Sequence, residues 1–171
     1  MTSLRFKKFV FSLLFGLITC SVHAQFISAT IGINGLTCSQ CSRSVEIQLR
    51  KLPFVKDVKM DLEQTRGTIF FKENKKVNIA SIANAVKDAG FSVRFLKADI
   101  HKAALNISEQ GCFSLDGNSY TVLSPYTIPE KLILTLQFVG KDYLPGSDFK
   151  RYKLPATTKC KGKTVYYIIA N

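Results

Sequence analysis

The chain has 171 residues, 46% of them hydrophobic, and carries 24 Lys and Arg against 12 Asp and Glu. This length allows one domain or two small ones. The basic residues are scattered singly, so they predict a solvated basic surface, suited to an anionic membrane or an acidic partner protein, and no nucleic-acid partner is expected.

The first 24 residues have the three parts of a secretory signal peptide. Arg5, Lys7 and Lys8 form a basic start, residues 9–18 an apolar run, and residues 22–24 a small-x-small cleavage site. We therefore expect an exported protein, with the periplasm as its compartment. Removal of the signal leaves a net charge of +9 and four of the five cysteines.

This segment has two alternative interpretations, and each would hold the protein at a membrane. The apolar run is short for a membrane span, but an uncleaved anchor is one alternative. The other is a lipoprotein, because Leu17-Ile18-Thr19-Cys20 weakly resembles a lipoprotein signal in which Cys20 becomes the lipidated first residue. Thr19 is an unfavourable residue before such a cysteine, so cleavage after Ala24 is the preferred prediction.

Strand and helix patterns alternate along residues 25–98. Residues 26–33 predict a strand that ends at the turn Asn34-Gly35, and apolar residues from about Ser39 to Leu52 have helical spacing until Pro53 stops the helix. Residues 58–62 and 68–71 then predict two strands joined by a hairpin connection at 64–67.

A second helix and a last strand complete this part. Asn78 is the expected N-cap of the helix, Gly90 its left-handed C-terminal residue, and residues 92–96 form the strand. The order strand, helix, strand, strand, helix, strand predicts an α+β fold, the ferredoxin-like βαββαβ sandwich, in which two helices cover one face of a four-stranded antiparallel sheet.

Residues 99–171 have a different pattern, with β-branched, aromatic and turn residues in place of helical periodicity. Strands are expected at 113–115, 120–123, 132–139 and 164–169, and the first two form a hairpin around Asp116-Gly117-Asn118. Residues 140–155 have no clear period. We expect a small β-rich second domain, a compact barrel or sandwich, whose role the pattern does not indicate.

Cys38 and Cys41 form a CxxC motif between the first strand and the first helix. Two intervening residues allow both sulfurs to face one point, and free amides in the first helical turn stabilise a thiolate at Cys41. Thiolates select soft ions, and two of them without an obvious third ligand suit low-coordinate Cu(I) better than a structural zinc, which takes four ligands.

The same pair has other interpretations. A zinc half-site lacks partner ligands. A thiol–disulfide redox motif is the strongest rival, because oxidoreductases also use CxxC at a helix N-terminus, although the predicted strand order is not that of a thioredoxin-like fold. The third interpretation is an inert disulfide formed in an oxidising compartment. We favour the metal site, then the redox motif.

Several motifs together give the chain a family resemblance. Gly35-Leu36-Thr37-Cys38-Ser39-Gln40-Cys41 before a helix, Val58-Lys59-Met60-Asp61-Leu62, and Asp88-Ala89-Gly90-Phe91 resemble the heavy-metal-associated domain. That family includes copper chaperones, N-terminal domains of copper-transporting P-type ATPases and the periplasmic mercury-binding protein. The resemblance spans about residues 27–97.

The resemblance implies roles for individual residues. Cys38 and Cys41 match the metal-binding cysteines, Thr37 the residue before them, and Phe91 a loop residue packed near the site. Leu36 stands where the family usually has Met, a swap of similar volume beneath the loop. An aromatic at Phe91 is typical of the ATPase-type and bacterial domains, although a simple core aromatic explains it equally well.

Cys112 and Cys160 lie near the two ends of the β-rich half. In an exported protein we expect a structural disulfide between them, in preference to an additional metal site or to ligands lent to the first domain's ion.

The function expected from the sequence is that of an exported protein that binds a soft metal, Cu(I) before Hg(II) or Zn(II), at Cys38 and Cys41. The ion would be sequestered or delivered to a membrane metal transporter, without enzymatic catalysis. The alternatives are a thiol–disulfide redox carrier, periplasmic mercury binding, and a binding module whose second domain docks on a membrane partner. Export makes the redox state of the pair decisive, because oxidation abolishes metal binding.

Overall fold

The computed structural model describes residues 25–123, 130–152, 154–155, 160–162 and 164–171. The expected signal peptide, Cys20 included, lies outside the described residues. Within those ranges, no helix has both the length and the apolar character needed to cross a bilayer.

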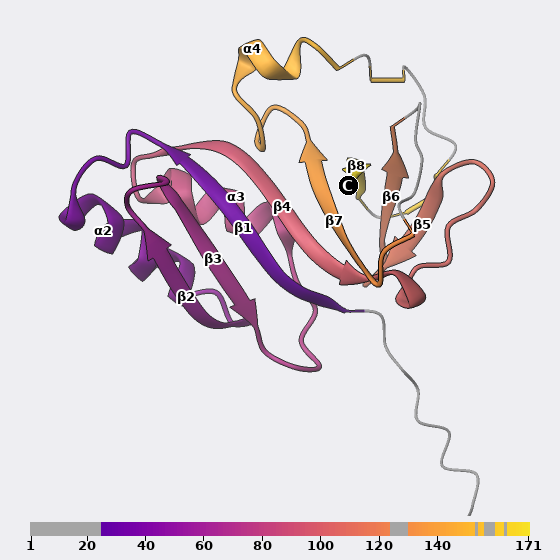
Figure 1. Ribbon diagram of the computed structural model, residues 1–171, viewed down its shortest axis with the longest axis horizontal. Helices are drawn as coiled ribbons and strands as arrows, with labels where there is room; N and C mark the ends of the chain where they lie inside the picture. The colour runs from indigo at the N-terminus through magenta and orange to yellow at the C-terminus, as the bar shows by residue number, and fades with distance from the viewer. Residues whose placement is uncertain (1–24, 124–129, 153, 156–159, 163) are drawn as a thin grey trace, which may run out of the picture.

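The described residues form one eight-stranded sheet with two longer helices against it (Figure 1). The strands are β1 (Phe26–Asn34), β2 (Val55–Asp61), β3 (Arg66–Phe71), β4 (Ser92–His101), β5 (Cys112–Leu115), β6 (Asn118–Val122), β7 (Ile133–Val139) and β8 (Val165–Ala170). The helices are α2 (Ser39–Arg50), α3 (Ile79–Asp88), the short α4 (Gly146–Phe149) and the 3-10 turn η1 (Lys102–Ala104). The strand order is β2-β3-β1-β4-β7-β8-β6-β5.

The first half has the predicted ferredoxin-like order, so the predicted fold class is confirmed. Both helices lie on one face of the β2-β3-β1-β4 part of the sheet (Figure 1), where α2 buries Val45 and Leu49. The Asn78 side chain caps α3 by accepting a hydrogen bond from the Ser81 amide at 3.2 Å. Gly90 follows α3 with a φ of +88°, a conformation that favours glycine, as the sequence predicted.

The second half extends the sheet and does not form a separate barrel or sandwich. β4 continues to His101, and its residues 97–101 pair with β7, so the expected boundary after residue 98 falls inside a strand. The sequence pattern ended this strand early because Lys97 and Asp99 are charged. Both are only half-buried, and the Asp99 carboxylate accepts hydrogen bonds from Ser28 at 2.8 Å and Thr135 at 2.7 Å.

The remaining elements of the second half agree in part with the sequence. The β5–β6 hairpin turns at Asp116 and Gly117, both with positive φ, as a two-residue hairpin turn requires. β7 and β8 occur within one residue of their predicted ends. The short helix α4 was not predicted, because one turn is too short to produce a helical period.

The second half also contacts α3 directly. Lys87 of α3 forms an ion pair with Asp142, which follows β7. Buried rings from both halves form one aromatic cluster, in which Tyr120 lies within 6.1 Å of Phe26 and 5.3 Å of Tyr166 between ring centroids. The strands after β4 therefore share one hydrophobic core with the ferredoxin-like part.

Candidate metal-binding loop

The loop between β1 and α2 presents the CxxC motif to solvent. Gly35 has a φ of +77°, which favours glycine and turns the chain out of β1. Leu36 then points into the core with 1% of its surface exposed, while Thr37 and Cys38 are exposed. The inward residue thus anchors the loop, and its neighbours are left accessible.

The N-terminus of α2 fixes the orientation of Cys38. Cys38 is the N-cap residue, with extended backbone, and its carbonyl accepts the Ser42 amide at 3.0 Å. Its Sγ accepts the Cys41 amide at 3.1 Å. A helix N-terminus has free amides and a positive dipole end, so negative charge on this sulfur would be stabilised. The sequence predicted that free amides would stabilise a thiolate at Cys41. In the structure, the Cys41 amide instead donates a hydrogen bond to Cys38 Sγ.

The structure brings the two cysteines together in the oxidised form. Their Cα atoms are 5.1 Å apart and their Sγ atoms 2.16 Å apart, as a disulfide. Cys38 is exposed and Cys41 half-buried against the core. A disulfide offers no thiolate, so metal binding at this loop requires reduction first. After reduction, the same backbone directs both sulfurs toward one point.

The two supporting residues lie in different positions. Thr37 is exposed beside Cys38. Phe91 is half-buried against the core and directly precedes Ser92, which pairs with Asn34 at the end of β1. The side chains of Asn34 and Ser92 are also hydrogen bonded at 3.2 Å. This pairing places the loop that carries Phe91 next to the β1–α2 loop.

No group of three or more Cys, His, Asp or Glu side chains in the described parts of the chain is arranged to hold a metal ion. The loop therefore offers two sulfur ligands from the described residues. Such a pair suits an ion that accepts low coordination and leaves space for an incoming ligand.

Leu36 should be essential to the loop. Leu36→Ala is expected to destabilise the protein by about 2–5 kcal/mol, because a fully buried side chain is lost beneath the cysteines. Leu36→Met preserves volume and should cost less than about 1.5 kcal/mol. Urea unfolding of the two variants and the wild type measures this, and equal midpoints for all three would contradict the anchoring role.

Arg50 connects α2 to β2 through ion pairs and a hydrogen bond. Its guanidinium contacts the Glu46 carboxylate at 2.7 Å, the Asp57 carboxylate at 2.8 Å and the Val58 carbonyl at 2.8 Å. The hydrogen bonds from Arg50 lower the pKa of Glu46 and of Asp57 below their usual values near 4.5 and 3.8. The sequence indicated the contact with Glu46, four residues away, but not the contact with Asp57.

The ion pairs of Arg50 predict a small pH dependence of the free energy of unfolding. The folded-state pKa values of both carboxyls are lowered, so the two carboxylates stabilise the fold at pH values above their usual pKa values. This stabilisation is lost as the pH falls through the lowered pKa values. Arg50→Met removes that contribution. We expect the stability difference between wild type and variant to shrink as unfolding is measured from pH 6 down to pH 3, and a constant difference would contradict it.

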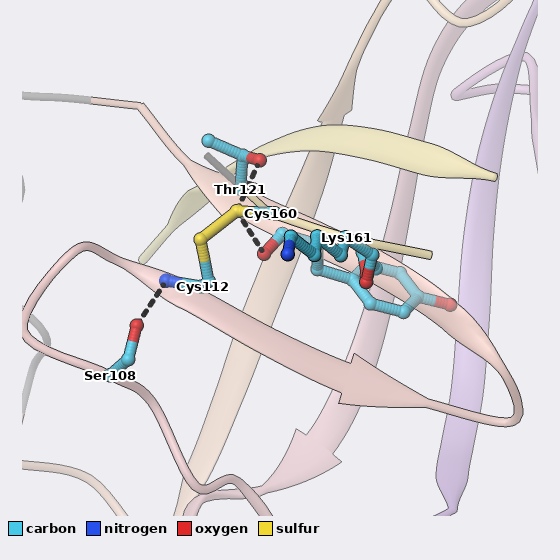
Figure 2. The surroundings of a disulfide bond; sticks show 7 residues. Ser108, Cys112, Thr121, Cys160 and Lys161 are labelled. Atoms are coloured by element: carbon cyan, nitrogen blue, oxygen red, sulfur yellow. Dashed lines mark hydrogen bonds between the residues drawn. A yellow bond between two sulfur atoms is a disulfide. The ribbon is translucent and has the colours of Figure 1, made fainter. Parts of the chain in front are cut away.

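Cys112 and Cys160 form a second disulfide, in the β-rich part, with an S–S distance of 1.98 Å (Figure 2). The Cys112 amide donates to Ser108 Oγ at 3.1 Å, and Thr121 Oγ1 donates to Cys160 Sγ at 2.9 Å. β5 lies at the far edge of the sheet, five strand positions from β1. The structure therefore does not bring this pair to the CxxC loop.

Comparisons with known proteins assign the first half to a family. The model of the heavy-metal-associated domain matches residues 30–92. The copper chaperone CopZ of Bacillus subtilis is 31% identical over 64 residues, which cover 37% of this chain and 91% of the chaperone. The chain therefore belongs to the heavy-metal-associated domain family, a family of metal-binding domains, as its motifs predicted.

Longer proteins match over the same domain. Copper-transporting ATPase 1 of Rhizobium meliloti is 40% identical over 74 residues, 43% of this chain, but the match spans only 9% of that ATPase. Among solved structures, a copper binding domain from HMA7, a P-type ATPase, has 32% identity and a TM-score of 0.37, covering 40% of this chain and 90% of that one.

Proposed function

We propose that reduced Cys38 and Cys41 bind one Cu(I) ion outside the cytosol, for sequestration or for delivery to a membrane metal transporter. The observation that carries the proposal is the convergence of both sulfurs on one exposed loop, with Cα atoms 5.1 Å apart at the N-terminus of α2. The copper-related names of the relatives support the choice of metal. The signal-like sequence of residues 1–24 supports the compartment.

The ligand set favours Cu(I) over Zn(II). Zinc in structural sites takes four ligands, whereas the described residues supply two soft sulfurs here. Cu(I) prefers thiolates and tolerates low coordination. Hg(II) shares these preferences, so the binding experiment must compare Hg(II) with Cu(I).

Transfer of the ion would occur by ligand exchange. Cys38 is exposed, so an incoming thiolate from a partner can add to the metal on that side before a sulfur of this chain leaves. The helix N-terminus stabilises the negative charge of the two-thiolate complex, because free amides and the dipole point toward Cys38. No bond other than metal–sulfur bonds forms or breaks.

An anaerobic titration tests this function. Fully reduced protein is titrated with Cu(I) in the presence of a competing chelator, and with Hg(II) in a parallel experiment. We expect one tightly bound Cu(I) per chain for the reduced protein and none for the oxidised one. Absence of tight one-to-one uptake by the reduced protein would refute the proposal.

The Cys38–Cys41 disulfide favours a second candidate, a thiol–disulfide redox carrier. Here the reduced pair would pass two electrons to a partner disulfide, form the 38–41 disulfide and release two partner thiols. The reduction potential of the pair and insulin-reductase activity separate the two functions. A potential in the range of known thiol–disulfide oxidoreductases, together with that activity, would support the carrier.

A further inference from the structure

The end of the sheet at Gln25 carries exposed apolar side chains. Leu132 is 74% exposed, Ile133 43% and Ile27 38%. Strand pairing brings them together, because Ile133 lies opposite His101 and the Lys102 amide donates to the Leu132 carbonyl at 2.9 Å. At this end of the sheet the end of β4 lies between the start of β1 and the start of β7 (Figure 1).

Two adjoining hollows widen this apolar surface. One, of about 580 Å³, is lined by Ile27 and Ala103, among others. The second, of about 660 Å³, is lined by Ala103, Leu105, Ile107 and Leu132. Ala103 lines both hollows, so they form one continuous surface. We call the surface formed by Ile27, Lys102, Ala103, Leu105, Ile107, Lys131, Leu132 and Ile133 the basal patch.

The basal patch also carries positive charge. Lys102 and Lys131 line the second hollow, and neither side chain has an ion pair with the described residues. The neighbouring acids are Glu73, at the first hollow, and Glu130, next to Lys131. Exposed apolar side chains beside cations are the composition of surfaces that dock on anionic membranes, where lysine heads meet the lipid phosphates.

We propose that the basal patch docks on a membrane surface that contains anionic lipid. The exposed apolar side chains and the two lysines support this occupant in the cleaved protein. In a form that keeps the uncleaved N-terminal segment, the chain connectivity also supports it over a second copy. The apolar run of residues 9–18 ends at Ile18, and six residues separate it from Gln25. An extended link of that length spans about 25 Å at most, so any form of the chain held in a bilayer by this run keeps the basal patch near the lipid.

This orientation has a consequence for the CxxC loop. β1 is nine residues long, starts at the basal patch and ends at the loop (Figure 1). At about 3.3 Å per residue, the cysteines would stand roughly 25–30 Å from the bilayer. The loop would face away from the lipid, accessible to a partner. This inference does not depend on which metal the loop binds.

A site-specific fluorophore tests the docking, because the chain contains no Trp. Leu132→Trp reports on the basal patch, and Ile47→Trp, at a site 42% exposed on α2, is the matched control. Both full-length variants are mixed with phosphatidylcholine vesicles, with and without 30% phosphatidylglycerol. We expect a blue shift for Leu132→Trp on the anionic vesicles and none for Ile47→Trp.

The contribution of the two lysines of the basal patch is tested in the Leu132→Trp background. Lys102→Gln with Lys131→Gln should weaken partition to the anionic vesicles by roughly thirtyfold, because two lysines near such a surface together contribute about 2 kcal/mol. Unchanged partition would overturn the role of the charge.

Three other outcomes would overturn the proposal. Equal shifts at both tryptophans would mean that the chain attaches without this orientation. A concentration-dependent shift without vesicles, with a dimer in sedimentation, would assign the basal patch to a second copy. No shift with any vesicle would exclude docking at Leu132.

Discussion

Serine at both Cys38 and Cys41 is expected to abolish Cu(I) uptake by the reduced protein. Both sulfurs belong to one loop, and no further ligand group occurs among the described residues to replace them. A hydroxyl is a hard, weak ligand for Cu(I), so we expect at least a thousandfold loss of affinity, about 4 kcal/mol. Chelator competition under anaerobic conditions measures it.

Thr37→Ala is the matched control for this loss. Thr37 is exposed next to Cys38 in the same loop, so its truncation perturbs the loop and leaves both sulfurs in place. This variant should bind Cu(I) within about threefold of wild type. If the double serine variant also retains affinity, the metal lies elsewhere and the assignment of the loop is wrong.

Serine at Cys112 and Cys160 is expected to cause a large loss of stability. The two cysteines are 48 residues apart in sequence, and a cross-link over such a loop contributes about 4 kcal/mol on the chain-entropy model. The disulfide joins β5 to residue 160 near the sheet edge. Urea unfolding without reductant should show a clearly lower midpoint for the variant.

The double serine variant of Cys38 and Cys41 is the control for this comparison as well. Those cysteines are three residues apart, so their disulfide restricts the unfolded chain much less. A Cys112 and Cys160 variant that unfolds at the wild-type midpoint would mean that this disulfide does not form in the protein or does not stabilise it. Titration of free thiols in the unfolded, unreduced wild type separates these two cases.

Much of the first half could be predicted from sequence because its signals are local. The helix-capping Asn78, the helix-ending Pro53, and Gly90 with its positive φ each act within one turn of the chain. The Asp-Gly turn of the β5–β6 hairpin is equally local. Such residues determine where an element begins or ends without reference to its partners.

The joining of the two halves is not local, and the sequence did not reveal it. β4 continues through Lys97 and Asp99 because Asp99 is satisfied by Ser28 of β1 and Thr135 of β7, far away in sequence. Those contacts exist only after β4 has paired on both edges. The sequence pattern of β4 alone therefore indicates a shorter strand and an independent second domain.

In the candidate site, too, the sequence indicated the residues of local motifs but not the contacts that depend on the fold. The CxxC spacing and the family motifs indicated Cys38, Cys41, Thr37 and Phe91 directly. The bond from the Cys41 amide to Cys38 Sγ depends on the exact residue at which α2 begins, and helix boundaries are the least certain part of a sequence reading. The contact between Arg50 and Asp57 depends on how α2 packs on β2.

X-ray absorption at the copper edge of the Cu(I)-loaded, reduced protein tests the central claim most directly. We predict two sulfur neighbours around each copper ion and the disappearance of this sulfur signal in the Cys38→Ser/Cys41→Ser variant. A first coordination shell with nitrogen or oxygen ligands, or one that persists in that variant, would contradict a two-cysteine copper site on this loop.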